Sequence, residues 1–138
     1  MTSFAFVVHD LGKAKAALRA ARERGLCVCL VSAPGAAAAL GPAVWREMTA
    51  EAAKAEPGAL HSAILDCGRD PGVALGALRE GVGAIAVDVA DEVRAKIADI
   101  ARQRGATVRL LPPSPACDLG QAPDPLAAAR AWLNGKAP

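Results

Sequence analysis

The stretch AILDCGRDPGVALGALREGVGAIAVD, residues 63–88, predicts two buried strands around one helix. Its two ends, AILD and GAIAVD, are apolar runs of strand length, and the helix between them opens with Asp70 and Pro71. Asp is a preferred N-cap residue, and Pro is favoured at the first helical position. A strand–helix–strand unit of this kind is typical of parallel sheets, because parallel strands need a crossover connection.

The rest of the chain repeats this alternation of strand and helix. Because the expected strands are apolar along most of their length, they indicate a parallel sheet that is buried on both faces. Segments 32–41 and 112–125 are expected to form a loose turn and an irregular loop. The expected fold class is therefore α/β, with a parallel sheet of about five strands and flanking helices. The strands are expected at residues 4–8, 26–31, 61–66, 83–89 and 106–111, and the helices at 10–25, 42–56, 70–80, 91–104 and 124–133.

Length and composition limit the possible functions. A chain of 138 residues predicts one domain, residues 1–138. The net charge of +2 and the 3% of aromatic residues argue against a nucleic-acid-binding protein. No apolar run is long enough to span a bilayer and no basic leader is recognised, so we expect no membrane partner and a cytoplasmic location. The four cysteines lack C-x-x-C spacing, which favours reduced thiols.

Polar residues gather where the expected strands end. In parallel α/β folds, ligands bind outside the carboxyl ends of the strands. Asp66 follows an apolar strand and precedes Gly68, where the backbone can approach a ligand closely. Asp66 is therefore either a base or a structural carboxylate that accepts loop N–H groups. The candidates are Asp66, Cys67 and His9 for catalysis, and Asp10, Ser32, Gly68 and Asp88 for ligand binding.

Cys67 and Asp10 each have two interpretations. Cys67 is either a nucleophile or ligand activated by a nearby His9, or a buried inert thiol. The pairing with His9 requires that the first and third strands be neighbours, which the sequence does not determine. Asp10 is either a ligand-binding residue or the N-cap of the first helix.

Several motifs, in serial order, resemble the first part of a class II fructose-bisphosphate aldolase barrel. They are AFVVHDLGKAKAALRAA (5–21), CLVSAPGAAAALGPAVWREMTAEAAKAEP (29–57) and ILDCGRDPGVALGALREGVGAIAVD (64–88). The resemblance implies a partial TIM barrel; a flavodoxin-like open sheet is the alternative. It gives Asp66 the family's acid/base position, Ser32 the place of an active-site serine, and Asp88 an acidic position after the fourth strand.

The chain also departs from this family. The family uses a divalent metal, usually zinc, and Cys67 stands where a metal-binding histidine belongs. The other metal histidines come from later strands, whereas the only histidines here are His9 and His61. His61 opens its expected strand, at the opposite end from Asp66. No complete zinc site is therefore encoded, the cofactor is left undetermined, and classical class II aldolase activity is not expected.

Three functions follow from this comparison. The first is a small-molecule-binding or regulatory homo-oligomer without aldolase chemistry, which takes a small or phosphorylated ligand. The second is a lyase-type enzyme with a rebuilt, metal-assisted site at the strand ends. The third is an interaction module that completes another protein. A homodimer is expected because five barrel units alone leave an apolar sheet face and two open edges in water.

Overall fold

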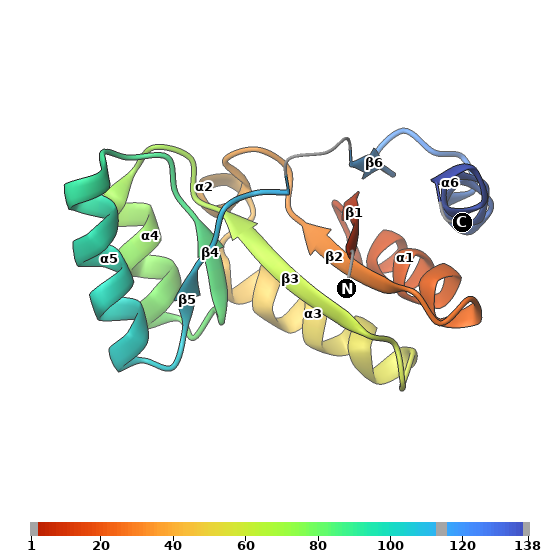
Figure 1. The fold of residues 1–138 in the computed structure, drawn as a ribbon, viewed down its shortest axis with the longest axis horizontal. Coiled ribbons are helices and arrows are strands. Elements are labelled where there is room, and N and C mark those ends of the chain that lie inside the picture. Colours follow the sequence, from red (N-terminus) through yellow and green to blue (C-terminus); the bar gives the residue numbers. More distant parts are fainter. Residues whose placement is uncertain (1–2, 113–115, 137–138) are drawn as a thin grey trace. The chain divides into compact units, whose positions relative to one another are not determined.

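A computed structural model describes residues 3–112 and 116–136 of the chain (Figure 1). Helices and strands alternate along it. The elements are β1 (Ser3–Val7), α1 (Leu11–Glu23), β2 (Cys27–Val31), α2 (Ala36–Ala39), α3 (Pro42–Ala55), β3 (His61–Asp66), α4 (Pro71–Arg79), β4 (Ala84–Ala86), α5 (Asp91–Gln103), β5 (Thr107–Val108), β6 (Cys117–Asp118) and α6 (Pro125–Lys136).

The strands form one parallel sheet with the order β5-β4-β3-β2-β1-β6. This confirms the α/β class with a parallel sheet and flanking helices. Consecutive strands from β1 to β5 are neighbours, which is the order of a TIM barrel. A flavodoxin-like sheet has the order 2-1-3-4-5 instead.

Aspartate N-caps begin three helices where the sequence predicts them. The side chain of Asp10 accepts the backbone N–H of Lys13 at 2.9 Å. Asp70 accepts the N–H of Gly72 at 2.8 Å, and Asp124 accepts that of Ala127 at 3.1 Å. These caps are confirmed because capping depends on residues within one turn of the chain.

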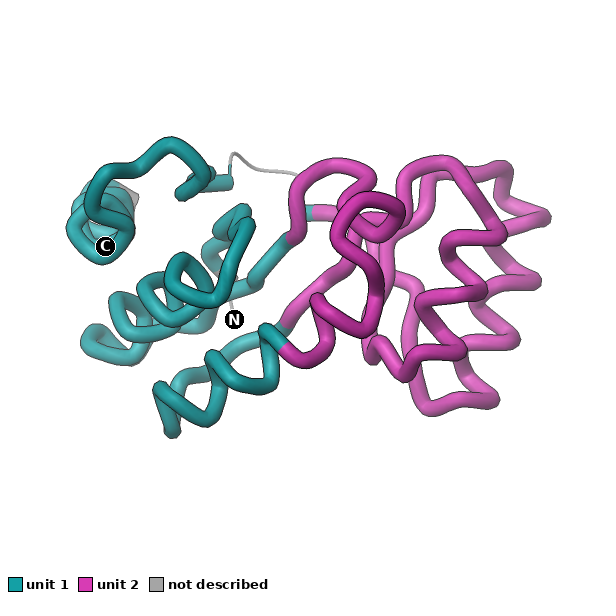
Figure 2. Tube along the Cα trace, turned by 180° about the vertical axis from the view of Figure 1, so that it is seen from behind, with its two compact units in different colours: residues 1–31, 48–62, 112–138 teal, residues 32–47, 63–111 magenta. Residues whose placement is uncertain are grey.

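The chain folds into two compact units, each assembled from segments that are distant in sequence (Figure 2). Unit 1 comprises residues 1–31, 48–62 and 112–138, and unit 2 comprises residues 32–47 and 63–111. In unit 1, α6 packs on α1. Trp132 of α6 contacts Phe6 and Phe4 of β1 edge-on, with ring centroids 5.2 and 6.2 Å apart. Trp132 therefore anchors α6 against β1.

Unit 2 contains most of β3 together with β4, β5, α4 and α5. Helices α4 and α5 lie side by side (Figure 1). Ile64, Leu78 and Ile85 are fully buried, and Trp45 is 1% exposed. Trp45 therefore belongs to the buried core of this unit.

The carboxyl-terminal part of the sheet differs from the sequence-based expectation. The fifth strand is only Thr107–Val108, because β4 ends at Ala86 and the last backbone hydrogen bond to it runs from Arg109 to Ile85. The proline-rich segment was wrongly expected to lack regular structure. Cys117–Asp118 pairs with β1 as β6, since residues 116–122 contain no proline and retain their N–H donors. Residues 113–115 of that segment lie outside the described residues.

Three further local expectations were wrong. Residues 36–39, expected to be a loose turn, form the short helix α2. Val44 shares a helical face with the buried Met48 and Ala52, which predicts that it faces the core, but it is 50% exposed. The apolar pattern of residues 91–104 also predicts that Val93 and Ile100 face inward with Ile97. Ile97 is buried, but Val93 and Ile100 are 36% and 37% exposed. The buried stripe of α5 is therefore narrower than its apolar pattern predicts.

Candidate functional site

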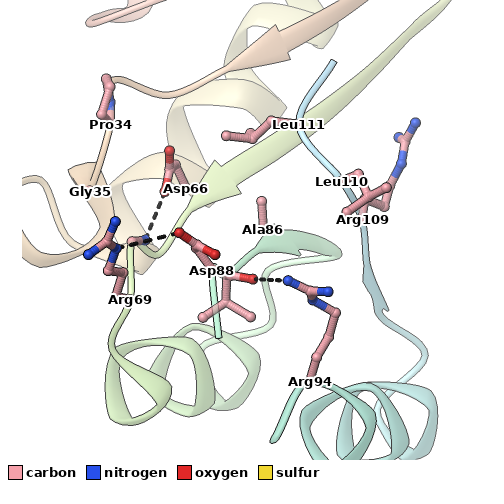
Figure 3. A pocket seen from close by; sticks show the side chains of 12 residues that line it. Pro34, Gly35, Asp66, Arg69, Ala86, Asp88, Arg94, Arg109, Leu110 and Leu111 are labelled. Carbon is pink, nitrogen blue, oxygen red and sulfur yellow. Dashed lines mark hydrogen bonds and ion pairs between the residues drawn. The ribbon is translucent and has the colours of Figure 1, made fainter. Parts of the chain in front are cut away.

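A pocket of about 350 Å³ opens at the carboxyl ends of β3, β4 and β5, entirely within unit 2 (Figure 3). This is the position at which ligands bind in parallel α/β folds. The lining combines small residues of the β2–α2 loop with charged residues that follow the strands. The charged residues are Asp66, Arg69, Asp88, Arg94 and Arg109.

Asp66 is the only buried charged residue in the lining, with 9% of its surface exposed. One carboxylate oxygen accepts the backbone N–H of Gly68 at 2.8 Å. The second oxygen accepts no hydrogen bond from another described residue. Since no buried side-chain oxygen in the described residues lacks a partner, this oxygen reaches solvent. Asp66 thus serves its own loop and still presents an acceptor to the pocket.

Ser32 and Gly68 hold Asp66 in place. The Ser32 hydroxyl, 2% exposed, accepts the backbone N–H of Asp66 at 2.9 Å. Gly68 has φ +63°, a left-handed conformation that favours glycine. Its N–H turns back onto the Asp66 carboxylate, as in an Asx turn. Ser32 and Gly68, two of the four ligand-binding candidates, therefore lie beside Asp66 and contribute to its position.

Cys67 is next to Asp66 in sequence, but its side chain is buried, with 3% of the residue exposed. The thiol donates to the carbonyl of Leu65 at 3.8 Å. Burial, assisted by the negative charge of Asp66, raises the pKa of the Cys67 thiol to about 11. A protonated, buried thiol is a poor nucleophile and a poor metal ligand at neutral pH.

Asp88 and Arg69 form an exposed ion pair at the pocket rim. Arg69 Nε lies 3.4 Å from Asp88 Oδ2, and the two side chains are 87% and 76% exposed. The Asp88 backbone N–H donates to the carbonyl of Gly68 at 2.8 Å, which joins the loops after β3 and β4. Figure 3 shows this pair near Asp66 and the β2–α2 loop.

Sequence reasoning missed the arginines of this pocket. Arg94 donates to the carbonyls of Val87 and Val89 at 3.5 and 3.3 Å and to Asp91 at 3.2 Å. The guanidinium of Arg109 forms no hydrogen bond or ion pair with another described residue, and it extends outward at the rim (Figure 3). Their positions in the sequence could have indicated them. Arg94 lies in the first turn of the helix that follows β4, and Arg109 directly follows β5.

His9 and Asp10 belong to unit 1. His9 Nε2 lies 2.8 Å from Asp118 Oδ1, and Asp118 also accepts the N–H of Gly120 at 2.8 Å. Asp10 caps α1 and pairs with Lys13 at 2.6 Å. In the sheet order β2 stands between β1 and β3, so the strands that precede His9 and Cys67 are not neighbours. The partner that the structure gives His9 is Asp118.

The residues around Asp66 do not fit the zinc ion that the family resemblance implies. Protein zinc sites combine three or four Cys, His or carboxylate ligands. No group of three or more His, Cys, Asp or Glu residues that could hold a metal ion occurs within residues 3–112 and 116–136. The charged side chains that share the pocket with Asp66 are mostly arginines, which repel a metal cation.

Several solved structures resemble this fold, and one of them names a protein class. It is the crystal structure of a protein described as a candidate fructose-1,6-bisphosphate aldolase from Coccidioides immitis, with a TM-score of 0.64 and 22% sequence identity. The match covers 78% of this chain but only 40% of that one, so it supports the aldolase-like fold and nothing further. No protein-family model matches the sequence, and neither does any curated protein. Within the described residues, no helix combines the length and apolar character needed to cross a membrane.

Proposed function

We propose that the protein is an aldolase-related, small-molecule-binding protein of regulatory type, which does not perform class II aldolase chemistry. One observation carries this proposal. The buried carboxylate of Asp66 keeps one oxygen accessible inside a concave pocket at the strand carboxyl ends. A pocket of this size, with a few convergent polar groups, is typical of small-ligand sites.

The way in which Asp66 is held also supports binding. Ser32 fixes its backbone and Gly68 fixes one of its oxygens, so little side-chain freedom is lost when a ligand binds the other oxygen. The open oxygen is an acceptor, which suits a hydroxyl or amino group of a polar ligand. Ser32 and Gly68 would thus contribute to binding chiefly through Asp66.

Ligand-dependent thermal stability tests this proposal. A panel of small hydroxylated and amino compounds would be screened for a rise in Tm, because a ligand that binds only the folded state stabilises it. Asp66→Asn should abolish the shift. Asp99→Asn, an exposed carboxylate on α5 outside the pocket, should retain it. Equal shifts in the wild type and Asp66→Asn would refute a site at Asp66.

An enzyme with a rebuilt site is the second candidate. The open oxygen of Asp66 favours it, since a base must reach the proton that it removes. The expected result is deuterium incorporation at the carbon beside the carbonyl of a small hydroxyketone in D2O, lost in Asp66→Asn. Incorporation at the buffer rate would exclude this base. If the wild type bound one zinc ion per chain and Cys67→Ser did not, the enzyme would be metal-assisted. That result would contradict our conclusion that the residues around Asp66 do not fit zinc.

We also propose a homodimer in preference to a module that completes another protein. Large apolar side chains remain exposed after β5, where Leu110 is 78% and Leu111 42% exposed. Strand β5 is also an edge strand with one unpaired side, which is costly to leave open. Light scattering on the purified protein should give the mass of two chains. A monomer would refute the homodimer, and a stable complex with a different chain would favour the module.

A further inference from the structure

The pocket of unit 2 is lined by three arginines against two aspartates. One of the aspartates, Asp88, already pairs with Arg69 at the rim. The remaining carboxylate, Asp66, has no arginine partner among the described residues. Arg94 pairs with Asp91, which lies outside the lining, so Arg109 is the lining arginine that has no acidic partner among the described residues. The three arginines come from three separate segments: the β3–α4 loop, α5 and the residue after β5.

Arg94 is the fixed member of this set. Its side chain is 32% exposed and is tied to two backbone carbonyls of the β4–α5 loop and to Asp91. Those three hydrogen bonds leave two of the five N–H donors of a guanidinium unused. A guanidinium that is already held in position loses little entropy when it binds an anion.

Arg109 and Arg69 are the adjustable members. Arg109 is exposed and its guanidinium has no partner among the described residues, so its long side chain can turn without breaking a contact. Arg69 is held only by the exposed pair with Asp88, and such surface pairs contribute little stability. Either guanidinium can therefore exchange its present surroundings for a bound anion at low cost.

We infer that this pocket binds the oxyanion group of its ligand, a phosphate monoester or a dicarboxylate, through Arg94 and Arg109. This inference rests on the proposed function and deepens it by naming the ligand class. The planar guanidinium matches the two oxygens of a carboxylate or phosphate. Arg109 would supply a charge that no described acid neutralises, and Arg94 would supply its two unused N–H donors. The open oxygen of Asp66 then accepts a hydroxyl of the same ligand.

Inorganic phosphate and malonate are the probes, titrated separately while backbone amide shifts of Gly68 and Asp88 are followed by NMR. We expect saturable shifts in the wild type. Arg109→Ala should weaken binding about tenfold, because one charge-assisted contact is lost. Arg94→Lys keeps the positive charge but loses the planar guanidinium, and it should weaken oxyanion binding by a similar factor. Arg104→Ala, an exposed arginine of the same unit outside the pocket, should have no effect.

The outcomes separate the two proposals. Binding of phosphate without malonate identifies a phosphorylated ligand, and the reverse identifies a dicarboxylate. If neither oxyanion binds but a neutral polyol still raises Tm in an Asp66-dependent manner, the oxyanion inference is wrong and the proposed function stands. If nothing binds, both fail. Oxyanion binding that is equal in the wild type, Arg109→Ala and Arg94→Lys would also overturn the inference, because the anion would then lie elsewhere.

Discussion

The hydroxyl of Ser32 accepts the backbone N–H of Asp66 at 2.9 Å, and it donates to the carbonyl of Ala33 at 3.3 Å. Ser32 directly follows β2, whereas Asp66 is the last residue of β3. One buried side chain therefore continues the pairing of the two strands at the point where the backbone ladder ends. The position of the Asp66 carboxylate in the pocket depends on this bond.

Ser32→Ala should destabilise the protein by about 1–3 kcal/mol, because it leaves the buried N–H of Asp66 without an acceptor. Urea denaturation would measure this loss. Ser62→Ala is the matched control, since Ser62 lies on β3 and its hydroxyl bonds no other described residue. If the two variants lose equal stability, the Ser32–Asp66 bond contributes nothing specific.

Gly120→Ala should break the contact between His9 and Asp118. An added Cβ would lie 2.7 Å from His9 Nε2 and 2.9 Å from Asp118 Oδ1, which is too close for either atom. Because both atoms end exposed side chains that can swing away, we expect a stability loss of less than about 1 kcal/mol, and a changed imidazole signal for one of the two histidines in NMR spectra. Gly83→Ala, outside the helices and with nothing within 4 Å of an added Cβ, should leave both observables nearly unchanged.

Local features of the fold could be predicted from the sequence, and non-local ones could not. The caps at Asp10, Asp70 and Asp124 were correct because a cap involves only its own helix. The parallel sheet was correct because apolar runs report burial on both faces. Strand β6 was missed because its pairing with β1 joins residues more than one hundred positions apart, and the nearby prolines pointed to a loop.

The candidate site was predicted in part for the same reason. Asp66 ends β3, and Ser32, Gly68 and Asp88 follow strands. The structure places all four in one unit at the strand ends. His9 and Cys67 depended on strand adjacency, which only the fold decides. The arginines were overlooked because an arginine in an amphipathic helix or at a strand end usually belongs to a solvated surface. Only the pocket reveals that Arg94 and Arg109 share one concave site.

Trp132→Ala should detach α6 from β1. Its ring contacts both Phe4 and Phe6, and large-to-small changes of buried aromatic residues cost about 3–5 kcal/mol. Because Trp132 is only half-buried, we expect about 2–3 kcal/mol, with the near-ultraviolet dichroism of the aromatic cluster reduced. Leu60→Ala removes an exposed apolar side chain outside the pocket and should change stability by less than about 0.5 kcal/mol. Equal effects of the two changes would mean that α6 is not anchored by this ring.

The Cys67 thiol should make stability fall at alkaline pH. Burial, and secondarily the charge of Asp66, raises the pKa of this thiol from its ordinary value of 9.0 to about 11. Between these two values the folded state binds more protons than the unfolded state, so the free energy of unfolding decreases as pH rises. The stabilising effect is complete below about pH 9 and declines through pH 11.

Cys67→Ala isolates this effect from the titration of lysines and of Cys117, whose pKa burial also raises. Urea denaturation between about pH 8 and pH 11 should show a steeper loss of stability in the wild type than in Cys67→Ala. Thiol labelling of the native wild type at about pH 8 should modify Cys67 more slowly than the half-exposed Cys27, because only the thiolate reacts. If the free energy of unfolding fell equally with pH in the two proteins, or if Cys67 were labelled rapidly, the thiol would be accessible and reactive. Cys67 would then again be a candidate nucleophile.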